Sequence, residues 1–200
     1  ADMPHMTIRL AGPQDVAAML DIYTPVVRDT AISFEETAPS LAEFEDRVRA
    51  VSKSFPWLVC VRDGDVLGYA YGSTFSPRAA YQWAAETTVY VADGAKRRGV
   101  GRGLYTSLLA CLALQGYAVA IARIALPNAG SVGLHEAMGF ESFGMLPRAG
   151  FKLGTWHDVG YWRLALADVG QPDPLKTPSD LLGDASWSDG VRSGHAFLKQ

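Results

Sequence analysis

The sequence predicts one α/β domain in which strands alternate with helices. Three observations predict it. The 200 residues are 48% hydrophobic, which is enough to bury a core in one domain of ordinary size. Apolar residues recur with the period of strands in some segments and of helices in others. A strand pattern, a basic glycine-rich turn and an amphipathic helix also follow one another without a gap over residues 86–109.

The N-terminal half is expected to contain two amphipathic helices and three short strands. Pro13 opens the first helix, because proline is preorganised for the first helical turn. Ser40 caps the second helix, and Glu43 completes a capping box three residues later. Asp63-Gly64 is typical of a tight hairpin turn. The expected elements are a strand at 7–10, helices from Pro13 and from Ser40, strands at 57–62 and 66–74, and a loop at 73–83.

The C-terminal half continues the alternation. The continuous apolar run at 118–126 is typical of a buried strand. Gly116 and Gly139 end the helices that precede them, and Asn128 caps the second of these helices. The expected elements are a strand at 85–92, a helix at 102–115, a strand at 118–126, a helix at 128–138, and a final pair of strands at 140–146 and 151–166.

Both ends of the chain differ in character from the middle. Residues 1–5 are expected to be an extension that precedes a native Met6. The stretch 168–200 contains three prolines, then Ser, Gly and Asp among few apolar residues. It is therefore expected to be a tail that is loose or docked on a partner subunit, and the domain proper is expected to span 6–167. The apolar tail residues that could dock are Leu181, Leu182, Trp187 and Phe197.

Composition and charge argue against several classes of function. With a net charge of −3, the chain shows no electrostatic footprint for nucleic acid. No signal peptide or bilayer-spanning apolar run is apparent, so no membrane partner is expected. Cys60 and Cys111 lack the spacing of metal ligands. We therefore expect buried reduced thiols, no metal site and a cytoplasmic protein.

The glycine-rich turn is expected to bind a phosphate or pyrophosphate, because backbone N–H groups, basic side chains and the positive end of a helix dipole meet there. A P-loop string is absent, and Leu104 stands where a dinucleotide fingerprint needs its third glycine. The turn does fit a basic-x-x-Gly-x-Gly pattern; the alternative is a solvated turn between a strand and a helix. The expected ligand-holding residues are Lys96, Arg97, Arg98, Gly99, Val100, Gly101 and Arg102.

This turn resembles the acyl-coenzyme A pyrophosphate loop of the GNAT superfamily of N-acetyltransferases, although the position of Lys96 is usually Gln or Arg there. The order of expected elements is also the order of the GNAT fold, and the resemblance covers residues 7–166. It implies an α+β fold of three layers, with a mixed and mostly antiparallel central sheet flanked by helices. It also implies acetyl-CoA as the co-substrate.

Four separated motifs narrow the resemblance to the phosphinothricin N-acetyltransferases. The motifs are RAAYQW at 78–83, ETTVYV at 86–91, LPNAGSVGLHEAMGF at 126–140 and GFKLGTWHDV at 150–159. This resemblance implies a homodimer whose neighbouring subunits help to close the acceptor pocket. It also implies that the acceptor is a small amino acid analogue, such as phosphinothricin, methionine sulfone or methionine sulfoximine.

Acetyl transfer needs an unprotonated amine, so a base must take the amine's proton near neutral pH. Glu86, at the entrance to the strand before the turn, is expected to be that base, directly or through a water. The alternatives are a surface carboxylate or a partner of Arg78. The resemblance also implies that backbone N–H groups at a bulge in this strand stabilise the oxyanion. The residues expected there are Val89, Tyr90 and Val91.

The spacing of Asn128, Ser131 and His135 places them on one stripe of a helix. Asn128 and Ser131 are expected to face the pantetheine arm of the co-substrate. His135 is expected to face the reacting centre, where most superfamily members carry a tyrosine. The alternatives for His135 are a group that orients Glu86, a substrate ligand or a buried structural imidazole.

Arg78 is expected to hold the acceptor through a bidentate contact with an oxyanion. Ser76 stands where phosphinothricin enzymes often carry a lysine, so methionine sulfone, methionine sulfoximine or another amino acid is at least as suitable an acceptor. The residues expected to shape the acceptor pocket are Phe34, Tyr81, Thr88 and Tyr90.

Two other functions stay open at this level. One is a GNAT enzyme that acts on a protein N-terminus or an antibiotic, for which an open groove or an acidic patch would be expected. The other is a non-catalytic acyl-CoA sensor, which needs no base. Arg78 argues against the first function, because it suits an anionic acceptor, and Glu86 argues against the second. Release of CoA with and without an amine separates the enzyme from the sensor.

Overall fold

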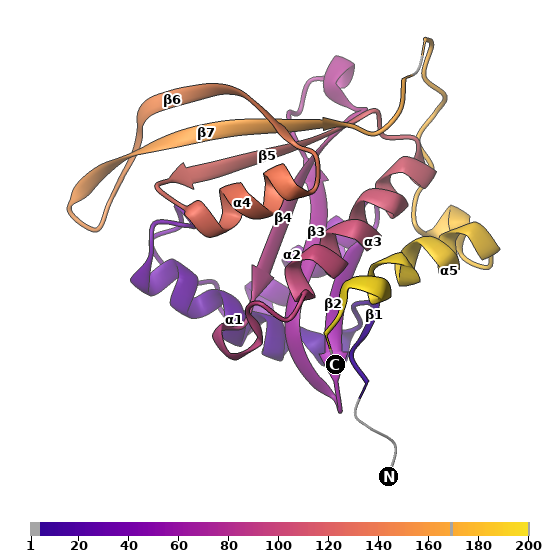
Figure 1. The fold of residues 1–200 in the computed structure, drawn as a ribbon, viewed down its shortest axis with the longest axis horizontal. Coiled ribbons are helices and arrows are strands. Elements are labelled where there is room, and N and C mark those ends of the chain that lie inside the picture. Colours follow the sequence, from indigo (N-terminus) through magenta and orange to yellow (C-terminus); the bar gives the residue numbers. More distant parts are fainter. Residues whose placement is uncertain (1–4, 169, 200) are drawn as a thin grey trace.

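The computed structural model describes residues 5–168 and 170–199, and a seven-stranded sheet runs through them (Figure 1). The strand order is β1-β2-β3-β4-β5-β7-β6, and β4 and β5 form the one parallel pair in this described sheet. The strands are β1 (Thr7–Leu10), β2 (Trp57–Arg62), β3 (Asp65–Thr74), β4 (Ala84–Val91), β5 (Val119–Leu126), β6 (Glu141–Lys152) and β7 (Thr155–Ala165). The expected mixed and mostly antiparallel GNAT sheet is thereby confirmed.

Helices cover both faces of this sheet. The helices are α1 (Val16–Asp29), α2 (Leu41–Ser52), α3 (Val100–Gln115), α4 (Ala129–Ala137) and α5 (Ala185–Arg192). On one face, α1 and α2 pack over an aromatic cluster in which Trp57 stacks on Tyr71 with ring centroids 3.9 Å apart. On the other face, α3 buries Leu104 and Leu108 against the sheet. Burial of such apolar faces on both sides is what holds the three layers together.

Local signals in the sequence explain where several elements begin and end. The Ser40 hydroxyl accepts from the Glu43 N–H, and the Glu43 carboxylate accepts from the Ser40 N–H, which confirms the capping box. Asp63 and Gly64 adopt positive φ values of 52° and 89° in the β2–β3 turn. Gly116 ends α3 with φ 101°, a conformation that glycine adopts without strain.

Two expected boundaries were wrong. Helix α3 begins at Val100 rather than 102, because Gly99 takes the left-handed conformation at the N-cap and the remaining glycines lie inside the helix. Strand β6 runs on to Lys152 instead of stopping at 146, with a register shift between Leu146 and Gly150. Residues 151–152 therefore belong to β6, and the turn to β7 lies at Leu153-Gly154, where φ is positive at both residues.

The C-terminal tail also differs from the loose arm expected. In the described part of 168–200, the tail packs on its own domain, where α5 and the 3₁₀ turn Ser193–Phe197 lie against α3 and β1 (Figure 1). Leu181 and Trp187 are buried there, whereas Leu182 stays exposed. Residues 1–4 of the expected N-terminal extension lie outside the described residues.

The β6–β7 hairpin extends beyond the body of the sheet (Figure 1). Its turn is tied to the end of α1, because the buried Lys152 ammonium donates to the carbonyls of Val27 and Ser33 at 2.7 and 2.6 Å. Burial of this ammonium lowers its pKa. The contact holds the loop after α1 beside the sheet. Within the described residues, no helix has the length and apolar character needed to cross a membrane.

Candidate functional site

The site begins where β4 and β5 part. These strands pair in parallel only where Ala84–Glu86 lie beside Val119–Ile121. Both strands continue for several residues beyond this point. Each keeps its outer partner, since β3 pairs with β4 as far as Val91 and β7 pairs with β5 as far as Leu126. The sheet therefore opens into a V whose vertex lies at Glu86 (Figure 1).

The open edge of β4 carries backbone groups without a strand partner. The Ala92 N–H donates to the Leu67 carbonyl at 2.9 Å, and hydrogen-bonded pairs alternate along an antiparallel ladder. Thr88 and Tyr90 therefore turn their backbone groups toward β3, while Val89 and Val91 turn theirs toward the gap. The β3–β4 register is continuous from Ala85 to Val91, so the expected bulge was wrong. Divergence of β5 exposes this edge instead.

A hollow of about 1110 Å³ lies along this edge, between α1, the glycine turn and α4. The N-terminus of α3 faces it, and a 16-residue helix carries a partial positive charge at that end. Of the residues expected to hold an anion, Arg98 is not part of its lining. The residues of that set that do line it are Lys96, Arg97, Gly99, Val100, Gly101 and Arg102.

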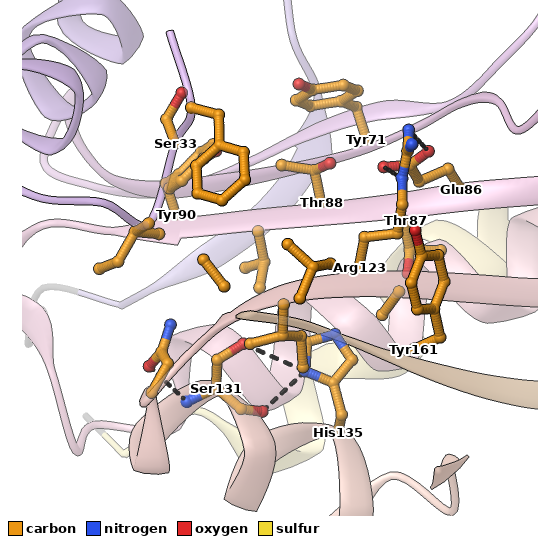
Figure 2. A pocket seen from close by; sticks show the side chains of 18 of the residues that line it. Ser33, Tyr71, Glu86, Thr87, Thr88, Tyr90, Arg123, Ser131, His135 and Tyr161 are labelled. Atoms are coloured by element: carbon orange, nitrogen blue, oxygen red, sulfur yellow. Dashed lines mark hydrogen bonds and ion pairs between the residues drawn. The ribbon is translucent and has the colours of Figure 1, made fainter. Parts of the chain in front are cut away.

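A second cavity of about 630 Å³ lies at the vertex (Figure 2). It meets the larger hollow at β4 and at the start of α4, because both are lined by Val89, Tyr90, Asn128 and Ser131. Asn128 caps α4 by accepting from the Ser131 N–H, as its place in the sequence predicts. One continuous space therefore runs from the glycine turn, along the open edge, to Glu86.

Glu86 forms a bidentate ion pair with Arg123 of β5 (Figure 2). The Nε–Oε1 and Nη2–Oε2 distances are 3.0 and 2.5 Å. The Glu86 side chain is 17% exposed and that of Arg123 is 47% exposed, so the pair opens toward the cavity. The partner of Glu86 is thus Arg123, which rules out the alternative of a pairing with Arg78. The hydrogen bond to Glu86 raises the pKa of Arg123, so the guanidinium stays charged.

His135 lies in the cavity wall with both ring nitrogens occupied. Its Nδ1 lies 2.7 Å from the Ser131 carbonyl oxygen, which can only accept, so Nδ1 carries the proton. Its Nε2 then accepts from the Tyr105 hydroxyl at 2.7 Å. Burial lowers the pKa of His135, although the Ser131 carbonyl opposes the shift, and burial raises the pKa of Tyr105. The two groups therefore form a neutral, buried pair.

The structure brings together only part of the expected acceptor set. Phe34 and Thr88 line the cavity with Tyr90, and the Phe34 ring lies against Gly150, near the turn of the β6–β7 hairpin. Arg78 and Tyr81 are exposed on the β3–β4 connection and do not line either hollow. The acceptor contact expected of Arg78 therefore has no support in the cavity of one chain.

Several other side chains line the cavity, and the sequence patterns did not single them out. Arg123 is the one charged residue in the apolar run 118–126, and that interruption was a usable signal. Tyr105 lies on an otherwise apolar face of α3, where nothing in the pattern distinguishes it from a core residue. The unexpected lining residues with polar groups are Ser33, Glu35, Tyr71, Thr87, Tyr105, Arg123 and Tyr161.

Comparison with known proteins agrees with this architecture. Residues 8–160 match the model of the acetyltransferase (GNAT) domain family. Phosphinothricin N-acetyltransferase of Streptomyces viridochromogenes is 38% identical over 169 residues, which is 84% of this chain and 92% of that protein. The L-methionine sulfoximine/L-methionine sulfone acetyltransferase of Pseudomonas aeruginosa is 36% identical, over 80% of this chain and 94% of its own length.

A solved structure shares the fold closely. The GNAT superfamily phosphinothricin acetyltransferase from Sinorhizobium meliloti, in complex with acetyl-CoA, superposes with a TM-score of 0.82 at 31% identity. The match covers 88% of this chain and 96% of that one. The family model and the relatives together show that this chain belongs to the GNAT family and is an acetyl-CoA-dependent N-acetyltransferase.

Proposed function

We propose that this enzyme transfers the acetyl group of acetyl-CoA to the amine of a small amino acid analogue of the phosphinothricin, methionine sulfone or methionine sulfoximine type. One observation carries the proposal: the open edge of β4 connects the hollow at the N-terminus of α3 directly to the cavity that holds Glu86. A thioester lying along that edge would reach the carboxylate without crossing any other element.

The hollow at α3 suits acetyl-CoA. Its pyrophosphate would bind the backbone N–H groups at the start of α3, with Lys96, Arg97 and Arg102 nearby as counter-charges. The amides of the pantetheine arm would pair with the free backbone groups of Val89 and Val91, much as an added strand would. Asn128 and Ser131, which line the opposite wall, would contact the same arm.

Direct attack then needs a base and an oxyanion site. The acceptor nitrogen would bond to the thioester carbon while Glu86 takes the amine proton, directly or through a water. A free backbone N–H of β4, at Val89 or Val91, would donate to the developing oxyanion. The carbon–sulfur bond then breaks, and the CoA thiolate leaves readily because a thiol pKa is only about 8.5. His135 and Tyr105 would hold α4 and α3 around this step.

The acceptor would occupy the cavity at Glu86. The Arg123 guanidinium supplies a cation there, which compensates Glu86 and favours an acceptor that carries a carboxylate and a phosphinate or sulfone oxygen. Phe34 and Tyr90 bound the cavity with apolar surface that suits a short side chain. This chemistry matches the substrates named for the relatives, which include an L-amino acid N-acyltransferase of Escherichia coli at 31% identity.

We also propose that the enzyme is a homodimer, in which a second copy covers the β6–β7 hairpin. The hairpin exposes several large apolar side chains together, and such a surface marks an interaction site. In addition, β6 is an edge strand of the described sheet, with unpaired backbone groups on one side. A two-fold pairing of identical hairpins would cover both apolar faces at once. The large apolar side chains that are at least half exposed on the hairpin are Phe143, Met145, Leu146, Phe151, Leu153 and Trp156.

A panel of amines tests the acceptor class. Release of CoA should be fast with phosphinothricin, methionine sulfone or methionine sulfoximine and slow with an aminoglycoside or a peptide. Arg78→Ala should raise the acceptor KM more than the acetyl-CoA KM if Arg78 reaches the acceptor in the dimer. A preference for cationic amines or peptides would place the chain elsewhere in the GNAT family. Binding of acetyl-CoA without transfer to any amine would indicate a sensor.

Gly101→Val tests the acetyl-CoA site. A Cβ at Gly101 would lie 3.3 Å from Leu134 Cδ2, so the larger side chain would intrude on the hollow where the pyrophosphate is expected. Calorimetry should show acetyl-CoA affinity reduced by about tenfold or more, which is about 1.4 kcal/mol. Gly94→Val is the matched control, because a Cβ there meets nothing within 4 Å. Unchanged affinity in a folded Gly101→Val variant would contradict the site.

Glu86→Gln tests the base. The amide keeps the shape but cannot take a proton, so kcat should fall on the order of 10²- to 10⁴-fold near neutral pH. The loss should shrink at higher pH, where the free amine forms unaided. Glu36→Gln, at an exposed glutamate outside the cavity lining, serves as the control. Near-normal turnover of the Glu86 variant at every pH would make Glu86 a structural residue.

Trp156→Glu tests the dimer. A charge in the middle of the apolar hairpin face should separate the copies, since an unpaired buried charge is strongly unfavourable at an interface. Light scattering should give twice the chain mass for the unmodified protein and the chain mass for the variant. Leu182→Glu, at a residue 65% exposed outside the hairpin, should leave the mass unchanged. A monomeric unmodified protein would rule the proposal out.

A further inference from the structure

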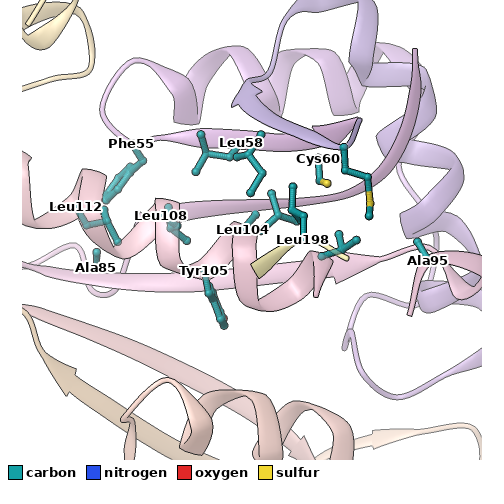
Figure 3. Close-up of a cluster of buried hydrophobic side chains, with 14 of the residues drawn as sticks. Phe55, Leu58, Cys60, Ala85, Ala95, Leu104, Tyr105, Leu108, Leu112 and Leu198 are labelled. Carbon is teal, nitrogen blue, oxygen red and sulfur yellow. The ribbon is translucent and has the colours of Figure 1, made fainter. Parts of the chain in front are cut away.

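The C-terminal tail packs against the N-terminal end of α3, where the glycine turn leads into the helix. The 3₁₀ turn Ser193–Phe197 and Leu198 run along α3 and end beside its N-terminus. Leu198 is buried in the core cluster with Leu104 and Tyr105 (Figure 3). This segment lies outside residues 8–160, which the GNAT family model matches. The family fold therefore does not by itself account for the contact.

Backbone meets backbone at two points, and glycine is required at both. A Cβ on Gly103 would lie 2.8 Å from the Gly194 carbonyl oxygen, and a Cβ on Gly194 would overlap the Gly103 carbonyl. A Cβ on Gly99 would overlap the Phe197 carbonyl. Gly99, at the N-cap of α3, and Gly103, in its first turn, thus accommodate the tail, whereas Gly101 faces the hollow.

Hydrogen bonds hold the segment in this position. The Gly194 N–H donates to the Ser107 hydroxyl at 3.0 Å, and the Lys199 N–H donates to the Arg98 carbonyl at 3.0 Å. The His195 ring anchors the segment to β1, because its Nε2 accepts from the Ile8 N–H at 2.7 Å. Arg98, which does not line the hollow, therefore contributes its carbonyl to the tail.

A side chain of the turn is held in the same way. The Arg102 guanidinium lies over the Phe197 ring, 4.4 Å from its centroid. A cation over an aromatic face is attracted by the ring quadrupole, which limits the directions that the side chain can take. Because Arg102 lines the hollow expected to bind pyrophosphate, the tail fixes both the backbone and one cation of that site.

We propose that the segment 193–199 positions the glycine turn for acetyl-CoA, so that docking of the tail and binding of the co-substrate favour one another. Free backbone N–H groups bind a phosphate well only when they are preorganised, since ordering them on binding costs affinity. A docked tail removes that cost. The coupling to acetyl-CoA rests on the proposed function, whereas the contact between tail and turn does not.

Gly194→Val tests the contact, because the new side chain must push the segment away from Gly103. In the ligand-free variant, the Gly103 N–H, which donates to the Gly99 carbonyl at 2.8 Å, should exchange with solvent faster than in the unmodified protein. The acetyl-CoA affinity should fall about tenfold, within the usual range for coupled sites. The acceptor KM, and kcat at saturating acetyl-CoA, should stay unchanged, which a general loss of stability would not produce.

Gly170→Val is the matched control, since it makes the same substitution in the tail at a glycine whose Cβ would meet nothing within 4 Å. The unmodified chain supplies a second test that needs no variant. Because coupling is reciprocal, saturating acetyl-CoA should slow exchange of the Gly194 and Lys199 N–H groups.

Two results would overturn the proposal. One is a folded Gly194→Val variant with unchanged exchange at Gly103 and unchanged acetyl-CoA affinity. The other is a tail whose exchange does not respond to bound acetyl-CoA in the unmodified chain. Failure of the unmodified protein to bind acetyl-CoA would instead overturn the proposed function. Exchange at Gly103 in the ligand-free variant would then still decide whether the tail positions the turn.

Discussion

The parting of β4 from β5 after Glu86 is the constraint on which the rest of the site depends. Both strands keep their outer partners, so the sheet loses only the ladder bonds between them. The backbone groups of Val89 and Val91 are left facing a gap. An unpaired buried N–H or C=O costs about 1–3 kcal/mol, so this edge needs water or a ligand. In the proposed function, this opening makes the edge of β4 a binding surface.

A buried polar cluster at the vertex ties this opening to the helices on one side of it. The Tyr105 hydroxyl from α3 bonds to His135 of α4 and lies 3.3 Å from the Thr87 hydroxyl, one residue after Glu86. Helix α3 begins at the glycine turn, and α4 forms the wall opposite β4. This cluster therefore links the glycine turn and α4 to the vertex at Glu86. The C-terminal tail then supports α3 from its other side. Thr87, Tyr105 and His135 are therefore positioned by buried contacts rather than by exposed loops.

Much of this could be predicted from local pattern. The order of elements, the capping box at Ser40, the turn at Gly64 and the glycine turn that leads into α3 all depend on neighbouring residues. The ion pair of Glu86 could not be predicted in this way, because Arg123 is distant in sequence and becomes adjacent only through the β4–β5 pairing. The docking of the tail is equally non-local. The tail is a polar, proline-containing segment, and its composition does not reveal that it covers the apolar surface of α3.

The most direct test of the central claim is to follow the backbone amide resonances of β4 by NMR while acetyl-CoA is added. The account predicts that the Val89 and Val91 N–H groups, which face the gap, shift strongly and exchange more slowly once acetyl-CoA is bound. The Thr88 and Tyr90 N–H groups, which are paired with β3, should change little in exchange. Equal responses at all four positions, or a response confined to residues outside the V, would contradict the claim that the parted strands bind the co-substrate.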